Sequence, residues 1–311
     1  MVESVMAFQL MGFSEVWWQQ LMSGVVLLLI LLVAFIGNLL IIMVSTFDQH
    51  LHNPMYFFLK HLSFLDLCYI LVTLPKAIVD NVTHSSSISL WGCILQVFLA
   101  VFLACTEMAL LTVMSYDRYV AICRPLHYEV IMKRGTCINM VTYSWFSGGA
   151  SGILHTATTF SLPLKASRPA HQFFCEIPQL LKLSCSVEYL AEVGAVAITS
   201  SLSFICFITI ALSYIHIFSM VLKIPSPLGQ SKAFSTCVPH LVVVTLFLGA
   251  AAMAYLRPAE DVPSVSDLLV SVFYTVVPPT LNPIIYSLRN KNMKAAVLKY
   301  LKIIYFGLTT G

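Results

Sequence analysis

Seven long apolar stretches alternate with short polar segments along the chain. Each contains about 20 or more mostly apolar residues, the length that a helix needs to cross a bilayer. In the run that follows them, Lys and Arg alternate with apolar residues, which is typical of an amphipathic helix on a membrane surface. The pattern predicts an all-α membrane protein, with one domain over residues 1–311, seven transmembrane helices and a short amphipathic C-terminal helix. The predicted helices are residues 21–47, 54–79, 92–123, 138–160, 191–222, 232–256 and 267–288, followed by the amphipathic helix 290–302.

Composition agrees with a membrane protein, and the distribution of charge gives its orientation. Hydrophobic residues make up 59% of the chain and charged residues only 10%, whereas a typical soluble protein has about 25% charged residues. The loops on one side, together with the C-terminal run, contain 12 of the 17 Lys and Arg residues. Because Lys and Arg are enriched in cytoplasmic loops, we expect a cytoplasmic C-terminus and an extracellular N-terminus.

Two acidic residues, Asp66 and Glu107, are placed in the hydrocarbon core by the predicted helices. An acid at membrane depth is costly and is therefore a hypothesis of function. The two carboxyls could form a site for a sodium ion or a proton. Alternatively, they are neutral acids that hydrogen-bond to nearby Ser or Asn side chains. The sequence leaves both interpretations open, and it predicts no other cofactor and no metal site.

Asp117, Arg118 and Tyr119 lie where the third predicted helix leaves the bilayer. By themselves they could be an ion pair in the interface, beside aromatic anchors. The whole string from Met114 to Tyr128 is more specific. It resembles the end of the third transmembrane helix and the next cytoplasmic loop of odorant (olfactory) receptors, which are rhodopsin-like (class A) G-protein-coupled receptors. Other blocks that resemble this family are Gly37-Asn38, Pro54–Leu59, Leu62–Asp66, Ser213-Tyr214, Lys232–Cys237 and Asn282–Asn290, within a resemblance from about Phe13 to Ala296.

The resemblance implies a multi-pass receptor of the plasma membrane and not an enzyme. Its partners would be a small volatile odorant, membrane lipid and a heterotrimeric G protein of the stimulatory olfactory type, through which it would raise cAMP. No nucleic acid is expected. The residues implied in G-protein coupling and in the activation switch are Asp117, Arg118, Tyr119, Tyr214, Lys232, Asn282, Pro283 and Tyr286.

The resemblance also implies a ligand site between the third, fifth, sixth and seventh helices. Its candidate residues are mostly small and apolar, which suits a small neutral ligand. An amine is not expected, because Ala100 stands where an acidic counter-ion would be needed. For each residue alone, ordinary helix packing is an equally good interpretation. The candidates are Ala100, Val101, Ala104, Cys105, Ile198, Thr199, Leu202, Leu248, Ala251, Ala252, Tyr255 and Thr275.

The chain keeps one expected disulfide of the family and departs from its pattern elsewhere. Cys93 and Cys175 match the pair that joins the third helix to the long extracellular loop. Lys165 stands where the partner of Cys185 is expected, which predicts a free Cys185. The only Asn-x-Ser/Thr sequence begins at Asn81, at the outer end of the second helix, and is a candidate for glycosylation. Leu248 replaces a tyrosine that is common at that point of the sixth helix.

Other functions fit less well. The His residues show no HExxH spacing, so a zinc hydrolase is not predicted. Seven helices with two buried acids would also suit a channel or a transporter, but the chain lacks the repeated half that is typical of secondary transporters. A receptor of the same fold that acts outside olfaction stays open as an alternative.

Overall fold

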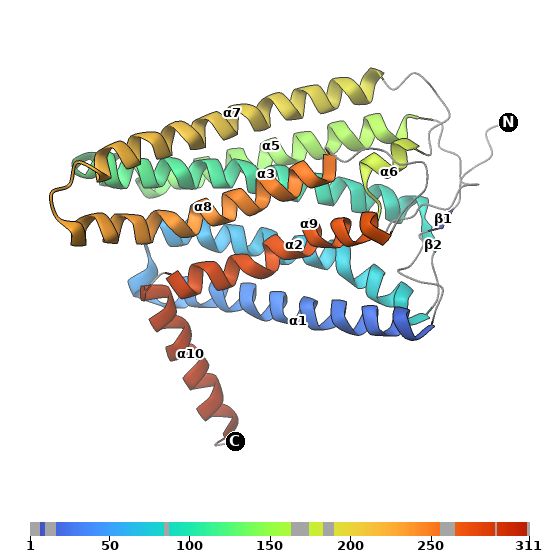
Figure 1. Ribbon diagram of the computed structural model, residues 1–311, viewed down its shortest axis with the longest axis horizontal. Helices are drawn as coiled ribbons and strands as arrows, with labels where there is room; N and C mark the ends of the chain where they lie inside the picture. Colours follow the sequence, from blue (N-terminus) through green and yellow to red (C-terminus); the bar gives the residue numbers. More distant parts are fainter. Residues whose placement is uncertain are drawn as a thin grey trace.

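The computed structural model describes residues 7–9, 17–83, 87–162, 174–182, 190–255, 265–289 and 291–309. Within these residues, seven helices of 25 residues or more pack side by side into one bundle (Figure 1). This confirms the predicted fold class. The seven helices are α1 (Trp17–Phe47), α2 (Pro54–Thr83), α3 (Leu90–Cys123), α5 (Arg134–Phe160), α7 (Leu190–Val221), α8 (Pro227–Tyr255) and α9 (Val265–Arg289).

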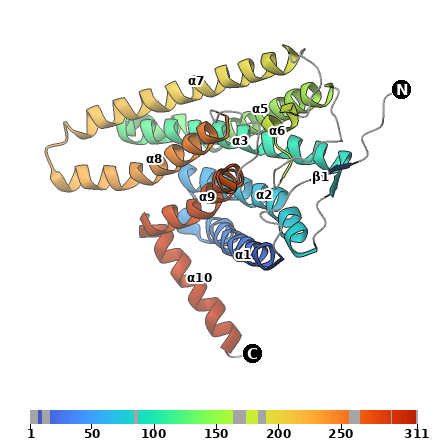
Figure 2. The same cartoon turned by 45° about the vertical axis from the view of Figure 1, so that its right-hand side comes forward.

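Short elements mark the two ends of the bundle. At one end lie α6 (Ile177–Lys182) and an antiparallel pair of strands, β1 (Ala7–Gln9) and β2 (Ser87–Ser89), in which Phe8 pairs with Ile88. We call this the disulfide end. At the other end, which we call the Arg118 end, lie η1 (Gln49–Leu51), η2 (Pro125–His127) and α4 (Tyr128–Ile131). Here α10 (Lys291–Thr309) extends away from the bundle in both views (Figures 1 and 2).

Five of the long helices, α1, α2, α3, α7 and α8, are long and apolar enough to cross a membrane. The large apolar side chains on the outer faces of α1 and α7, such as Leu29 and Phe204, are exposed in the isolated protein. In a bilayer these side chains would contact lipid. The protein is therefore a multi-pass membrane protein in which much of the apolar surface faces outward.

Some helices begin before their predicted first residue, for identifiable reasons. The predicted start of the first helix, residue 21, counted only the apolar run, but α1 begins at Trp17, and tryptophan is common at the membrane interface. Helix α3 begins at Leu90 because the Ser89 hydroxyl accepts a hydrogen bond from the Gly92 N–H at 3.1 Å. Helix α8 begins at Pro227, a residue type that suits the first helical position.

Close packing places α3 at the centre of the bundle. It contacts α2, α5, α7 and α8. Gly148 of α5 lies directly against α3: a Cβ atom built there would be 2.6 Å from the Phe102 carbonyl oxygen and would also meet the Thr106 hydroxyl. Only glycine permits this approach, so the α3–α5 contact depends on Gly148.

A proline in α9 explains the pair Gly37-Asn38. Pro283 has no N–H, so the carbonyl of Pro279, four residues earlier, loses its partner within the helix. The Asn38 amide of α1 donates a hydrogen bond to this carbonyl at 2.9 Å. Gly37 leaves room for the Pro283 ring, because a Cβ atom there would lie 3.1 Å from it. The two residues thus join α1 to the broken turn of α9.

Candidate functional site

A cavity of about 140 Å³ lies inside the disulfide end of the bundle. Four helices and the segment before and within α6 form its walls. The lining residues are Tyr69 of α2; Val97, Ala100, Val101, Ala104 and Glu107 of α3; Phe174, Cys175, Glu176, Ile177 and Pro178; Phe247, Ala250 and Ala251 of α8; and Pro278 and Pro279 of α9. Most of this lining is apolar, as expected for a small-molecule site.

Four of the twelve predicted ligand residues line this cavity: Ala100, Val101, Ala104 and Ala251. The prediction for the fifth helix does not match the structure. Ile198 and Leu202 are 54% and 50% exposed on the outer face of α7, and α2 contributes to the lining instead. Of the other candidates, Tyr255 lies in α8 but its side chain is outside the described residues, and the lining lacks Cys105, Thr199, Leu248, Ala252 and Thr275.

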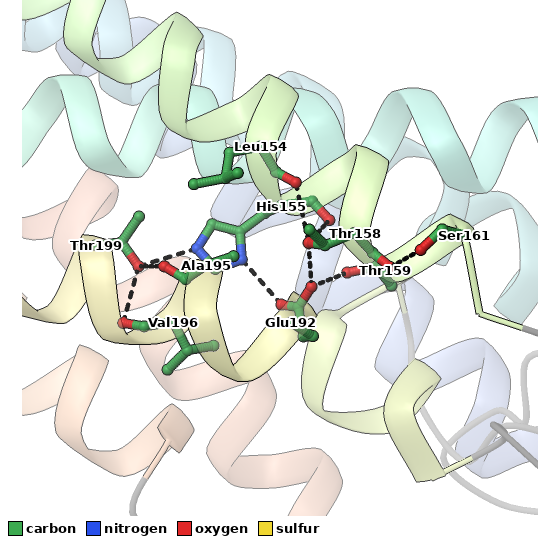
Figure 3. Close-up of polar contacts among 9 residues, drawn as sticks. All are labelled: Leu154, His155, Thr158, Thr159, Ser161, Glu192, Ala195, Val196 and Thr199. Atoms are coloured by element: carbon green, nitrogen blue, oxygen red, sulfur yellow. Dashed lines mark hydrogen bonds and ion pairs between the residues drawn. The ribbon is translucent and has the colours of Figure 1, made fainter. Parts of the chain in front are cut away.

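A buried polar cluster between α5 and α7 explains why Ile198 and Leu202 face outward (Figure 3). The Glu192 carboxylate accepts a hydrogen bond from His155 Nδ1 at 2.9 Å and another from the Thr159 hydroxyl at 3.1 Å. The Thr158 hydroxyl also donates to it. Two turns further along α7, Thr199 Oγ1 lies 3.0 Å from His155 Nε2. These contacts turn the polar face of α7 toward α5.

The sequence interpretation did not include His155 and Glu192 in any site. It counted Asp66 and Glu107 as the only acids in the hydrocarbon core, although the predicted helix 191–222 includes Glu192. The signal was nevertheless present. A histidine in an apolar stretch with two following threonines, and an acid at the beginning of the next helix, can satisfy one another once α5 and α7 lie side by side.

The predicted disulfide between Cys93 and Cys175 is present, with the two Cα atoms 5.5 Å apart. It joins α3 to the segment that covers the cavity. Gln96, one turn further along α3, accepts a hydrogen bond from the Cys175 N–H at 2.8 Å and donates one to the Val72 carbonyl at 3.0 Å. Together these contacts fix the cover of the cavity to α2 and α3. Cys185 and Lys165 lie outside the described residues.

The two predicted buried acids, Asp66 and Glu107, interact electrostatically with each other. Asn282 of α9 donates to both carboxylate oxygens of Asp66, at 3.3 and 3.0 Å, and all of Asp66 is buried. Glu107 lines the cavity, and its Oε1 atom has no hydrogen-bond partner among the described residues. In the described part of the chain, no three His, Cys, Asp or Glu residues form a group that could hold a metal ion.

At the Arg118 end, Asp117 interacts with two partners. Its carboxylate lies 3.9 Å from the Arg118 guanidinium and accepts a hydrogen bond from the Tyr128 hydroxyl at 2.8 Å. Burial, together with the nearby Asp117 charge, raises the pKa of Tyr128, so this phenol stays a neutral donor. Arg118 is itself buried. The pair is therefore an ordered internal contact and not a solvated ion pair on the surface.

A histidine that the sequence interpretation did not single out connects three helices near Arg118. His240 of α8 lies 2.8 Å from the Tyr214 hydroxyl of α7 and 3.1 Å from the Leu111 carbonyl of α3. Because a carbonyl only accepts, Nε2 of His240 carries a proton. With a neutral ring, Nδ1 then accepts from Tyr214. The bridge ties α8 to α3 in the arrangement seen here.

Tyr286, Tyr119 and Lys232 are further predicted switch residues. The Tyr286 hydroxyl is buried without a hydrogen-bond partner among the described residues. Tyr119 packs against His216, with ring centres 5.9 Å apart. Lys232 belongs to α8, but its side chain is outside the described residues.

The structure does not support glycosylation of Asn81. Its side chain is buried inside α2, and its amide donates a hydrogen bond to the Ala77 carbonyl at 2.8 Å. A glycan needs an exposed amide nitrogen.

The comparisons with known proteins agree with this arrangement. A protein family described as olfactory receptor matches residues 27–303. The chain is 55% identical to olfactory receptor 14L1 of Homo sapiens over 94% of this chain and 90% of that protein, and 55% identical to human olfactory receptor 14J1 over 96% and 93%. Human olfactory receptor 14A16 is also 55% identical, over 94% of each chain. Each of these relatives is an olfactory receptor, which agrees with the prediction of a receptor and not an enzyme for this chain. By family match and by identity over almost its whole length, the chain belongs to the olfactory receptor family.

Proposed function

We propose that this protein is an odorant receptor of the plasma membrane. In the proposal, a small, neutral and largely apolar volatile molecule binds in the cavity at the disulfide end, which faces outward. The receptor then activates a stimulatory G protein of the olfactory type at the Arg118 end, and cAMP rises. The observation that carries the proposal is the largely apolar cavity beside α3 and α8 in a member of the olfactory receptor family.

The two ends of the bundle share the helices through which a ligand could act. Ala251 and Phe247 of α8 line the cavity, and His240 of the same helix bridges to Leu111 of α3. A ligand shifts a two-state equilibrium only by its difference in affinity for the two states. We therefore propose that the ligand binds best when α8 has left the bridge, which would open a cleft for a helix of the G protein.

A sodium ion beside Asp66 and Glu107 is a further part of the proposal. Two observations support the sodium ion. The Oε1 atom of Glu107 has no hydrogen-bond partner among the described residues, and the carboxyls of Glu107 and Asp66 interact electrostatically. These two side chains would hold the ion. Its presence would raise the melting temperature of the purified receptor in sodium relative to potassium, and this difference would disappear in Asp66→Asn.

Signalling can be tested in cells that express the receptor with the olfactory-type G protein. Cells are exposed to a panel of volatile compounds while cAMP and surface staining are measured. The proposal predicts a dose-dependent cAMP response that Arg118→Ala abolishes without loss of surface staining. A cAMP response of equal size in Arg118→Ala would contradict the proposal. So would a receptor that reaches the surface and answers the compounds with an ion current but no rise in cAMP, as a channel would.

A further inference from the structure

Glu107 is a polar group in an otherwise largely apolar cavity. Its side chain lines the space but is only 5% exposed, and its Oε1 atom has no hydrogen-bond partner among the described residues. Burying a carboxyl oxygen without a partner costs free energy, so native structures nearly always provide one. The other polar side chains of the lining, Tyr69 and Glu176, are engaged in interactions of their own.

The position of Glu107 on α3 gives the cavity a direction. Ala100, Ala104 and Glu107 follow at intervals of four and three residues and so share one face of the helix. At 1.5 Å per residue, Glu107 lies about 10 Å below Ala100. Phe174 and Cys175 line the cavity on the side of the disulfide. The small side chains of Ala100 and Ala104 thus leave room for a ligand. Glu107 provides a polar group at the end of the cavity that is further from the disulfide.

The volume of the cavity suits a small occupant. A cavity of about 150 Å³ is sufficient to hold benzene, and this one has about 140 Å³. We infer that the cavity takes a compact alcohol or phenol of about one six-membered ring, whose hydroxyl donates a hydrogen bond to the Glu107 carboxyl. This inference rests on the proposed function and names its ligand class.

The chemistry of Glu107 supports a donor on the ligand. A carboxylate accepts hydrogen bonds at both oxygens, and a protonated carboxylic acid keeps an acceptor at its carbonyl. Rotation about the last side-chain bond is soft, so either oxygen can turn toward a ligand. A hydrocarbon of the same size would contact the apolar walls equally well but would leave the Oε1 atom of Glu107 without a hydrogen-bond partner. The site should therefore prefer the alcohol.

Glu107 also offers a route from the ligand to the switch. Its carboxyl interacts with Asn282 of α9, which is bonded to Asp66 of α2. A ligand hydroxyl on Glu107 would thus join a polar network that spans three helices. This makes Glu107 a residue that determines specificity and that also lies next to the activation machinery.

The test uses ligand pairs that match in size and differ in the hydroxyl: cyclohexanol with methylcyclohexane, and phenol with toluene. Binding is measured as the rise in melting temperature of the purified full-length receptor, in potassium buffer so that sodium does not compete for the carboxyl. The cAMP response to the same compounds is recorded in parallel. The variants are Glu107→Met, which keeps the length without an acceptor, Glu107→Gln, which keeps a carbonyl acceptor, and Ala104→Leu, which fills the cavity.

In the wild-type receptor we expect at least one alcohol to bind about tenfold more tightly than its hydrocarbon partner, the usual worth of one buried hydrogen bond. The ratio of the affinity for the alcohol to that for the hydrocarbon should fall to near one in Glu107→Met and persist in Glu107→Gln. Ala104→Leu should weaken the binding of both members of a pair. A general defect of the switch would lower both responses together and leave the ratio unchanged.

Two results would overturn the inference: wild-type receptor that prefers no alcohol, including one that binds neither member of either pair, or a preference that survives in Glu107→Met. If Glu107→Met does not fold, the ratio of alcohol to hydrocarbon affinity in the wild-type receptor and in Glu107→Gln still tests the inference. Alcohol binding without any cAMP response would count against the proposed function and leave the ligand class standing.

Discussion

Removing the carboxyl of Glu192 should destabilise the receptor, because three side chains of α5 donate hydrogen bonds to it. In Glu192→Leu, Thr158 can still donate to the Leu154 carbonyl at 2.9 Å. His155 Nδ1 and the Thr159 hydroxyl, both buried, lose their acceptor. Breaking a buried pair costs about 3–5 kcal/mol in soluble proteins, and single interhelical hydrogen bonds in a membrane protein average about 0.6 kcal/mol. Between these limits we expect a loss of about 2 kcal/mol, or about 4–8 °C in melting temperature.

The assay is thermal unfolding of the purified receptor, with a double-mutant cycle. His155→Leu and Glu192→Leu are measured alone and together, and Ser201→Ala, which changes an exposed hydroxyl on α7, serves as the control. The double variant should lose less than the sum of the single losses, because neither partner is then left buried and unpaired. The reasoning is refuted if Glu192→Leu melts like the Ser201→Ala control or if the two single losses simply add.

Three further changes have definite expected outcomes. Cys93→Ser should abolish surface delivery, because the bond to Cys175 fixes the cover of the cavity and losing a disulfide costs about 2–5 kcal/mol; normal surface staining would contradict this. Asn38→Leu should lower the melting temperature by a few degrees, since the Pro279 carbonyl loses its donor, and an unchanged temperature would show that another group replaces it. Tyr128→Phe should raise basal cAMP several-fold by releasing Asp117, which a comparison at equal surface expression would check.

The fold could be predicted because a bilayer leaves so few alternatives. Every backbone polar group must find a partner inside the membrane, so long apolar runs become helices. The α3 wall of the cavity, with Ala100, Val101 and Ala104, was anticipated from the resemblance to the family, and helical spacing is consistent with it. The disulfide came from the resemblance to a family, not from spacing.

What the sequence did not give is the rotation of each helix about its own axis. On α7 that rotation depends on the contact between Glu192 and His155, which lie 37 residues apart in the chain. Ile198 and Leu202 were therefore assigned to the wrong face. The bridge through His240 was missed for a similar reason: it joins α8 to a backbone carbonyl of α3, and a carbonyl leaves no signal in the residue types.

The most direct test of the central claim is guanine-nucleotide exchange on the stimulatory G protein by purified receptor in lipid vesicles, with and without ligand. The account predicts that the ligand accelerates exchange in the wild-type receptor, and that Arg118→Ala removes this acceleration while ligand binding persists. Exchange that does not respond to bound ligand in the wild-type receptor, or full acceleration in Arg118→Ala, would contradict it.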